Sequence, residues 1–299
     1  MLINGLLTVA SGEHGAQRDD GMDFKMRNEL KSGYAPVNGL KIYYEIHGAA
    51  NGGNPPLVLL HGGGDTIETS FGHVLPALAR SRQIIAFEQQ GCGHTADIPD
   101  RQFSFEQSAD DTEALLDYLH IDRADLFGFS NGGSIALHVA MRHPSRVRRL
   151  VVITALMKRD WADPQFWKSM KTARVKDMPM ELREAYLKVA PHPENLESFF
   201  FKSRNRMRDF KDVPDEAIRS INAPTLVMSS DRDVMRPEGA VELFRLLPHA
   251  QLAILPGSEH MEIPARTDWL VPMIEAFLNT PMQKEKSNEQ SENDSTRHD

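Results

Sequence analysis

Residues 128–132 read Gly-Phe-Ser-Asn-Gly and place a serine between two glycines where a strand is expected to turn into a helix. The preceding run, Ala124 to Phe127, is short and mostly apolar, as buried strands are, and residues 133–143 carry apolar side chains at helical spacing. A serine on so sharp a turn has a strained backbone, and small neighbours let the strand and helix approach. The stretch therefore predicts an exposed, nucleophilic hydroxyl on Ser130.

The motif alone also fits a glycine-rich turn whose serine merely caps the helix, because Gly-x-Ser-x-Gly occurs by chance in about one chain of this size in ten. A serine hydroxyl is a poor nucleophile near neutral pH, so it needs a base, and the base needs an orienting carboxylate. Whether Ser130 is a nucleophile thus depends on partners elsewhere in the chain.

Candidates for both partners follow two later strands. The apolar run 223–230 leads into Asp233, and the strand-like run 251–255 leads into a loop, residues 256–260, that ends in His260. Side chains at the carboxyl ends of neighbouring parallel strands can converge on one crevice. The order serine, acid, histidine is the one found when the nucleophile lies on a strand-to-helix turn.

These segments together resemble the α/β-hydrolase family from about Val37 to Leu278. Residues 57–64 (Leu-Val-Leu-Leu-His-Gly-Gly-Gly) look like the family's strand leading to its oxyanion loop. Residues 87–95 (Phe-Glu-Gln-Gln-Gly-Cys-Gly-His-Thr) are similar to its next strand-end loop, commonly written D-x-R-G-x-G-x-S. Glu88 and Gln90 stand where the family usually has Asp and Arg, which puts that loop's usual salt bridge in doubt.

The resemblance implies an α/β fold with a doubly wound, mostly parallel sheet, and the alternation of strand-like and helix-like runs predicts the same architecture. The hydrolase core is expected at residues 37–155 and 216–280. Between its two parts, the resemblance implies that residues 156–215 form a helical cap. Residues 1–36 and 281–299 are predicted to be flexible tails, because they lack periodic apolar residues.

The family pattern also assigns the remaining polar groups of the site. Asp231 and Asp233 compete for the role of its carboxylate. The family's carboxylate lies four residues before a proline, as Asp233 does before Pro237, which favours Asp233, and Asp231 is expected to cap the turn or the following helix. The backbone N–H groups of Gly63 and Asn131 are the implied oxyanion hole, where the negative charge of the reacting carbonyl would be bound.

The expected cap is rich in aromatic and methionine side chains, interleaved with Lys and Arg. Most of them should pack the cap against the sheet, but some should line an apolar pocket. The candidates for substrate contact are Trp161, Phe166, Trp167, Met170 and, next to the histidine, Met261. His61, at the start of the glycine loop, is expected to brace the loop backbone.

The predicted reaction is hydrolysis of a small, largely apolar carboxylic ester through an acyl-enzyme, with no cofactor. Lactone, thioester, amide or C–C bond hydrolysis, and cofactor-free haloperoxidase or perhydrolase chemistry, would use the same triad. A proline iminopeptidase-like activity is suggested by Gly91-Cys92-Gly93, although the elbow departs from that group. Relatives that open epoxides or remove halides use an aspartate in place of Ser130. The non-enzymatic alternative is a silent hydrolase fold that binds a ligand.

The composition is typical of a soluble enzyme, so the expected partner is a small-molecule substrate. It does not indicate an oligomeric state. The 299 residues are 40% hydrophobic and carry a net charge of −8, which argues against nucleic acid or an anionic membrane as partner. No apolar run approaches the ~20 residues that span a bilayer. The single Cys92 suits a reducing cytoplasm, and residues 1–10 resemble a signal peptide only faintly. No His or Cys spacing indicates a metal site.

Overall fold

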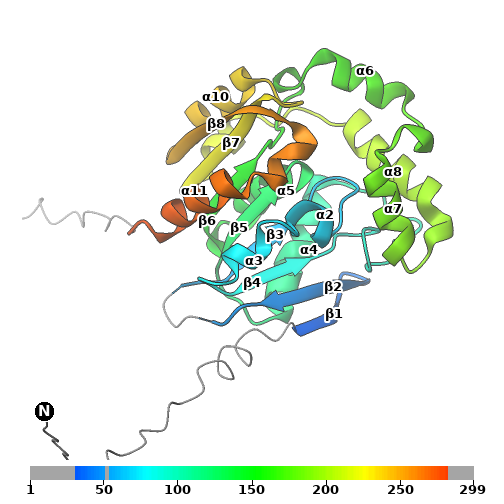
Figure 1. The fold of residues 1–299 in the computed structure, drawn as a ribbon, viewed down its shortest axis with the longest axis horizontal. Coiled ribbons are helices and arrows are strands. Elements are labelled where there is room, and N and C mark those ends of the chain that lie inside the picture. Colours follow the sequence, from blue (N-terminus) through cyan, green and yellow to red (C-terminus); the bar gives the residue numbers. More distant parts are fainter. Residues whose placement is uncertain (1–30, 51–53, 282–299) are drawn as a thin grey trace, which may run out of the picture.

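The computed structural model describes residues 31–50 and 54–281. Its centre is a sheet in which these residues form eight strands, in the order β1-β2-β4-β3-β5-β6-β7-β8 (Figure 1). Strands β1 and β2 pair antiparallel, as do β2 and β4, whereas all later neighbours pair parallel. The strands are β1 (Lys31–Val37), β2 (Leu40–His47), β3 (Leu57–Leu60), β4 (Ile84–Phe87), β5 (Ala124–Phe129), β6 (Val147–Ile153), β7 (Thr225–Arg232) and β8 (Ala250–Glu259).

Helices cover both faces of the sheet, and this explains why its central strands are apolar throughout. In β3, Leu57 and Leu59 pack into a cluster with α2, α3 and α11. The alternate residues Val58 and Leu60 pack into a second cluster with α4, α5 and α10. The predicted doubly wound α/β fold is confirmed. These helices are α2 (Ile67–Phe71), α3 (Leu75–Leu78), α4 (Phe105–Tyr118), α5 (Asn131–Arg142), α10 (Pro237–Leu246) and α11 (Thr267–Asn279).

A helical segment interrupts the strand–helix alternation between β6 and β7. Figure 1 shows its helices α6, α7 and α8 grouped together at one end of the sheet. A separate apolar cluster joins α7 and α8 to the loop after β4, and it contains Cys92, Tyr186 and Phe199. The helices of the segment are η2 (Arg159–Trp161), α6 (Pro164–Thr172), η3 (Val175–Asp177), α7 (Met180–Val189), η4 (Pro193–Asn195), α8 (Leu196–Arg208) and α9 (Asp215–Arg219).

Two sequence-based boundaries were wrong. Residues 31–36, assigned to the N-terminal tail, belong to edge strand β1, which buries Ala35 and Val37 against the core. Pro36 obscured this strand in the sequence, but an edge strand tolerates a residue that donates no hydrogen bond. Residues 256–259, assigned to a loop, continue β8 on the opposite edge of the sheet. The rest of both predicted tails, residues 1–30 and 282–299, lies outside the described residues apart from Pro281.

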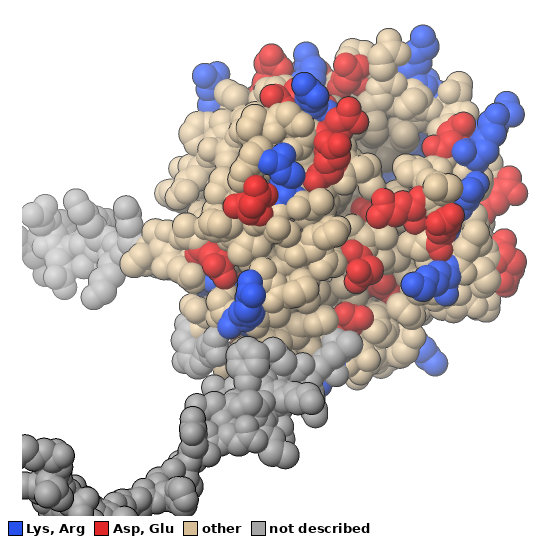
Figure 2. Space-filling model, viewed as in Figure 1, with Lys and Arg blue, Asp and Glu red and all other residues tan. Residues whose placement is uncertain are grey.

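Charged side chains of both signs are interspersed over the face shown in Figure 2, with no broad area of a single sign. Among the described residues, none of the helices has both the length and the apolar character needed to cross a bilayer. This surface offers neither the basic stripe typical of nucleic-acid binding nor a membrane-spanning helix.

Candidate active site

Ser130 lies on the turn between β5 and α5 with φ 55° and ψ −121°, a conformation that non-glycine residues rarely adopt. Its N–H donates to the carbonyl oxygen of Ile153 on β6 at 2.8 Å, which ties the turn to the neighbouring strand. The turn also needs close backbone packing: a Cβ on Gly132 would come within 1.9 Å of the Leu60 carbonyl oxygen. The sequence Gly-Phe-Ser-Asn-Gly thus forms the strained turn that the motif predicted, with Ser130 half-buried at the wall of a pocket.

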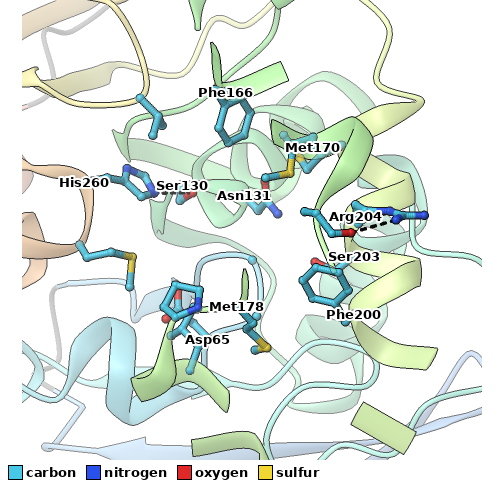
Figure 3. A pocket seen from close by; sticks show the side chains of 18 of the residues that line it. Asp65, Ser130, Asn131, Phe166, Met170, Met178, Phe200, Ser203, Arg204 and His260 are labelled. Carbon is cyan, nitrogen blue, oxygen red and sulfur yellow. Dashed lines mark hydrogen bonds between the residues drawn. The ribbon is translucent and has the colours of Figure 1, made fainter. Parts of the chain in front are cut away.

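The structure brings Ser130, His260 and Asp233 together as a hydrogen-bonded chain. His260 Nε2 lies 3.1 Å from Ser130 Oγ, and His260 Nδ1 lies 2.7 Å from Asp233 Oδ1 (Figure 3 shows the Ser130–His260 pair). With a proton on Nδ1, the imidazole donates to the carboxylate and accepts from the serine hydroxyl. Its ring also stacks on Phe129, with centroids 5.0 Å apart. This geometry allows proton transfer from the serine to the histidine.

The Asp233 carboxylate is fixed by several donors, and its side chain has no exposed surface. The Thr154 hydroxyl donates to Oδ2, and the backbone N–H of Val234 donates to Oδ1 at 2.6 Å. Asp231, two residues earlier, is exposed and accepts a 2.6 Å hydrogen bond from the Gly257 N–H on β8. Asp231 therefore ties two strands together, and only Asp233 contacts the histidine.

His61 braces the loop after β3, as expected. Its Nδ1 donates to the Gly62 carbonyl oxygen at 2.8 Å, and its Nε2 accepts from the backbone N–H of Gln89 at 3.0 Å. The side chain is buried, and desolvation lowers the pKa of His61 to about 4. Gly63 and Asn131, the residues of the expected oxyanion hole, both line the pocket that contains Ser130.

The loop after β4 replaces the family's usual salt bridge with other contacts. Buried Glu88 accepts hydrogen bonds from the His94 side chain at 2.9 Å and from the His94 N–H at 2.5 Å. Gln90 donates to Asp97 at 2.7 Å. Glu88 and Gln90, which stand where the family usually has Asp and Arg, therefore hold this loop through hydrogen bonds.

Asp65 is a pocket residue that the sequence analysis did not single out. It follows the three glycines, is only 3% exposed, and accepts a 2.9 Å hydrogen bond from the Thr69 hydroxyl. Desolvation raises the pKa of Asp65 to about 6. An acidic residue directly after the glycine loop was the available signal for it.

The pocket beside Ser130 has a volume of about 240 Å³ and walls from the core and from α6–α8 (Figure 3). Phe166, Met170 and Met261 line it, as expected. The pocket-lining residues that the sequence analysis missed are mainly apolar: Leu156, Met178, Pro179, Leu182, Phe199, Phe200 and Met207.

Trp161 and Trp167 do not line this pocket, contrary to the sequence-based assignment. Trp161 is 1% exposed and packs against α10, where a Cβ on Gly239 would come within 2.6 Å of its side chain. Trp167 stacks on Phe210, with centroids 5.7 Å apart, and its indole N–H donates to the Arg159 carbonyl oxygen at 2.5 Å. Both large rings are used to anchor the helical segment to the core.

Arg204 of α8 is the one arginine that lines the pocket within the described part of the chain, and the sequence analysis missed it. It donates to the Ala173 carbonyl oxygen at 3.0 Å and lies over the Phe201 ring. No carboxylate of the described residues lies within salt-bridge distance, and its buried Nε has no hydrogen-bond partner. Its other terminal nitrogen donates to the Asn205 side-chain oxygen at 3.4 Å, so the charge of the guanidinium has no carboxylate partner among the described residues.

Over residues 31–50 and 54–281, no three His, Cys, Asp or Glu side chains are grouped closely enough to hold a metal ion.

Comparison with known proteins agrees with this fold. Residues 55–201 match the family model described as the alpha/beta hydrolase fold. A 2-hydroxymuconate semialdehyde hydrolase of Pseudomonas sp. (strain CF600) is 32% identical over 255 residues, which cover 76% of this chain and 90% of that protein. The chain belongs to the α/β-hydrolase family.

Other relatives in the α/β-hydrolase family differ in their substrates. A proline iminopeptidase of Lactobacillus helveticus is 26% identical, covering 84% of this chain and 98% of that protein. A meta-cleavage product hydrolase from Pseudomonas fluorescens IP01 superimposes with a TM-score of 0.69 at 22% identity, covering 85% of this chain and 98% of that one. At that identity, the structural likeness supports the fold alone.

His61 and Asp65 give opposite contributions to the pH dependence of stability. Between pH 6.5 and 4, His61 gains a proton in the unfolded chain but stays neutral in the folded protein. The His61 contribution to the free energy of unfolding therefore decreases as the pH is lowered. Between pH 6 and 3.8, the folded protein binds a proton at Asp65 more tightly than the unfolded chain does. The Asp65 contribution to the free energy of unfolding therefore increases as the pH is lowered.

We therefore expect His61→Gln to gain stability relative to wild type as the pH is lowered, because the variant lacks the imidazole that resists protonation in the folded protein. The difference between the two free energies of unfolding should shift by roughly 2 kcal/mol between pH 7 and pH 4.5. Urea unfolding of both proteins at the two pH values measures this shift. Parallel pH dependences would show that His61 is not held neutral.

Proposed function

We propose that this protein is a serine hydrolase that cleaves a small, largely apolar carboxylic ester through an acyl-enzyme intermediate. The observation that carries the proposal is the continuous hydrogen-bonded chain from Ser130 through His260 to Asp233. Membership of the α/β-hydrolase family supports hydrolytic chemistry. The ester as substrate rests on the nucleophile and on the character of the pocket.

In the proposed mechanism, Ser130 Oγ attacks the acyl carbon while His260 Nε2 takes its proton, and Asp233 stabilises the resulting imidazolium. The backbone N–H groups of Gly63 and Asn131 bind the oxygen on which negative charge develops. His260 then gives its proton to the leaving alcohol. In the second half, His260 deprotonates a water molecule that attacks the acyl carbon. The bond between this carbon and Ser130 Oγ then breaks, His260 returns the proton to Oγ, and the carboxylic acid is released.

The pocket supports an apolar substrate, because most of its lining is hydrophobic. Phe166 and Met170 of α6 approach Ser130 from one side, and Met261 follows His260 in the chain (Figure 3). Helices α6–α8 provide much of this wall and serve as the proposed cap. Methionine side chains adapt to ligands of different shape, so a range of acyl chains can fit.

Replacing Ser130 by alanine tests the nucleophile directly. We expect Ser130→Ala to fold and to lose ester hydrolysis by about 10³-fold or more, because the acyl-enzyme cannot form. Hydrolysis of p-nitrophenyl butyrate measures the activity, and far-ultraviolet circular dichroism checks the fold.

A fluorophosphonate probe supplies the matched measurement, since it labels only activated serines. Wild type should be labelled once, at Ser130, and Ser130→Ala should not be labelled. Labelling at Ser134 or Ser203, which also line the pocket, would move the nucleophile elsewhere and contradict the proposal.

Arg204 favours a second candidate, hydrolysis of a C–C bond in an unsaturated keto acid. The relative that is 32% identical is named for the semialdehyde of 2-hydroxymuconate, which is a carboxylate. A pocket-lining guanidinium without a carboxylate partner suits such an anion. Ser130 and His260 would keep their roles, with the bond to carbon broken in place of the bond to an alkoxide.

This candidate predicts that the protein consumes 2-hydroxymuconate semialdehyde and that Arg204→Met raises the KM for it by about 10-fold or more. Hydrolysis of neutral p-nitrophenyl esters by the variant should stay near the wild-type rate. Arg208→Met is the matched control, because Arg208 lies on the same helix, is exposed and pairs with Asp209. If the protein hydrolyses neutral esters but does not consume the semialdehyde, the second candidate is wrong and the ester hydrolase is the remaining proposal.

A further inference from the structure

Asp65 places an acidic group in the wall of the pocket that contains the nucleophile. Figure 3 shows it on the opposite side of Ser130 from Phe166, near Met178. The residue is 3% exposed, so the carboxyl group is almost fully removed from bulk water. A buried carboxylate is costly unless hydrogen-bond donors or a cation compensate it.

The protein supplies only part of that compensation. The Thr69 hydroxyl donates to Asp65 Oδ1 at 2.9 Å, and the Ser70 side chain also hydrogen-bonds to the carboxyl group. Ser70 Oγ in turn accepts from the Gly62 N–H at 3.1 Å, so its hydroxyl proton is free to be donated. No Lys or Arg of the described residues lies within salt-bridge distance of Asp65. A carboxylate offers about four lone-pair sites, so acceptor capacity remains at the pocket wall.

We propose that Asp65 selects substrates that carry a hydrogen-bond donor, either a hydroxyl or an ammonium group, close to the scissile carbonyl. This inference rests on the proposed hydrolase function and specifies its substrate class. A wholly apolar substrate group placed against Asp65 would exclude water from the carboxylate and offer the carboxylate no hydrogen-bond donor. A donor in the same place would complete its hydrogen bonding. Sites of this kind discriminate strongly against analogues that lack the donor.

The surrounding charges agree with an accepting group at this position. The ionisable groups that face Asp65 are His260 at the start of η5 (His260–Ala265), Glu181 of α7 and the buried Cys92 thiol. Attraction to a protonated His260 favours the carboxylate, whereas burial and Glu181 oppose it. The pKa of Asp65 is raised to about 6, so at pH 7 to 8 the carboxylate still predominates and can accept from a donor.

Matched substrate pairs test the selection on both sides of the ester bond. On the acyl side, p-nitrophenyl 3-hydroxybutyrate and 3-aminobutyrate are compared with p-nitrophenyl pentanoate. On the alcohol side, 2-hydroxyethyl butyrate is compared with propyl butyrate. In wild type we expect at least one donor-bearing ester to have a kcat/KM about 10-fold or more above its partner, and the hydroxyl and amino arms distinguish the two donors.

Asp65→Leu should abolish this ratio, and Asp65→Asn, which keeps an acceptor oxygen without the charge, should retain part of it. Glu181→Gln is the matched control, because Glu181 is an exposed acid beside Asp65 that does not line the pocket. Its ratio should equal that of wild type. If Asp65 only braced the Gly62 loop, its replacement would lower kcat/KM for every ester alike and leave the ratio unchanged.

The pH dependence of the same ratio is a second readout. Both esters of a pair react through the same Ser130 and His260, so any pH dependence common to the two esters cancels in the ratio. The preference for the donor should be full above pH 7 and decline as the pH falls through about 6, where Asp65 gains a proton. A ratio that does not change between pH 5 and pH 8 would contradict the proposal.

Binding to Ser130→Ala separates this inference from the proposed function. The catalytically silent variant is titrated with 3-hydroxybutyramide and pentanamide, followed by nuclear magnetic resonance. Tighter binding of the hydroxylated amide, lost in the Ser130→Ala/Asp65→Leu double variant, would support the role of Asp65 even if esters were not hydrolysed. Equal binding of both amides, together with substrate ratios near one, would overturn it.

Discussion

The backbone at Ser130 is the constraint on which the rest of the site depends. Its positive φ lets the chain leave β5, place Ser130 at the wall of the pocket and enter α5 at once, and the hydrogen bond to Ile153 holds the turn against β6. Such strain persists only when the surrounding structure fixes it. The close contact of Gly132 with Leu60 provides that fixation and also brings the β3 loop beside the serine.

Parallel pairing then delivers the other groups to the same edge of the sheet. Strands β5, β7 and β8 end at the same edge of the sheet, with β6 between β5 and β7. This arrangement brings Ser130, Asp233 and His260 within hydrogen-bond distance although 130 positions separate the first and last in the chain. The loop after β3 contributes its glycines, braced by His61, together with Asp65. Burial holds the His61 side chain neutral and raises the pKa of Asp65. Asp65 therefore gives the part of the pocket wall opposite Phe166 a polar, acidic character.

The sheet and the Ser130, His260 and Asp233 contacts could be predicted because their signals are local. Buried strands read as short apolar runs, and the reacting side chains follow those runs directly. The residues that form the walls of the pocket could not be predicted in this way, because they depend on how α6–α8 lie against the core. Trp161 and Trp167 looked like ligand contacts but anchor that segment, whereas Arg204 and Asp65 gave no periodic signal. Edge strands β1 and β8 were misjudged where Pro36 and Pro256 interrupt them, since only their place at the edge makes proline acceptable.

The central claim is that Ser130 becomes acylated during turnover. The most direct measurement mixes wild-type protein rapidly with p-nitrophenyl butyrate, quenches with acid and locates the modification by peptide mass spectrometry. The account predicts one butyryl group on Ser130, formed with an early release of p-nitrophenolate and removed as the substrate is exhausted. Steady hydrolysis with no modification of Ser130 at any time, or with a butyryl group on another residue that turns over at the catalytic rate, would contradict it.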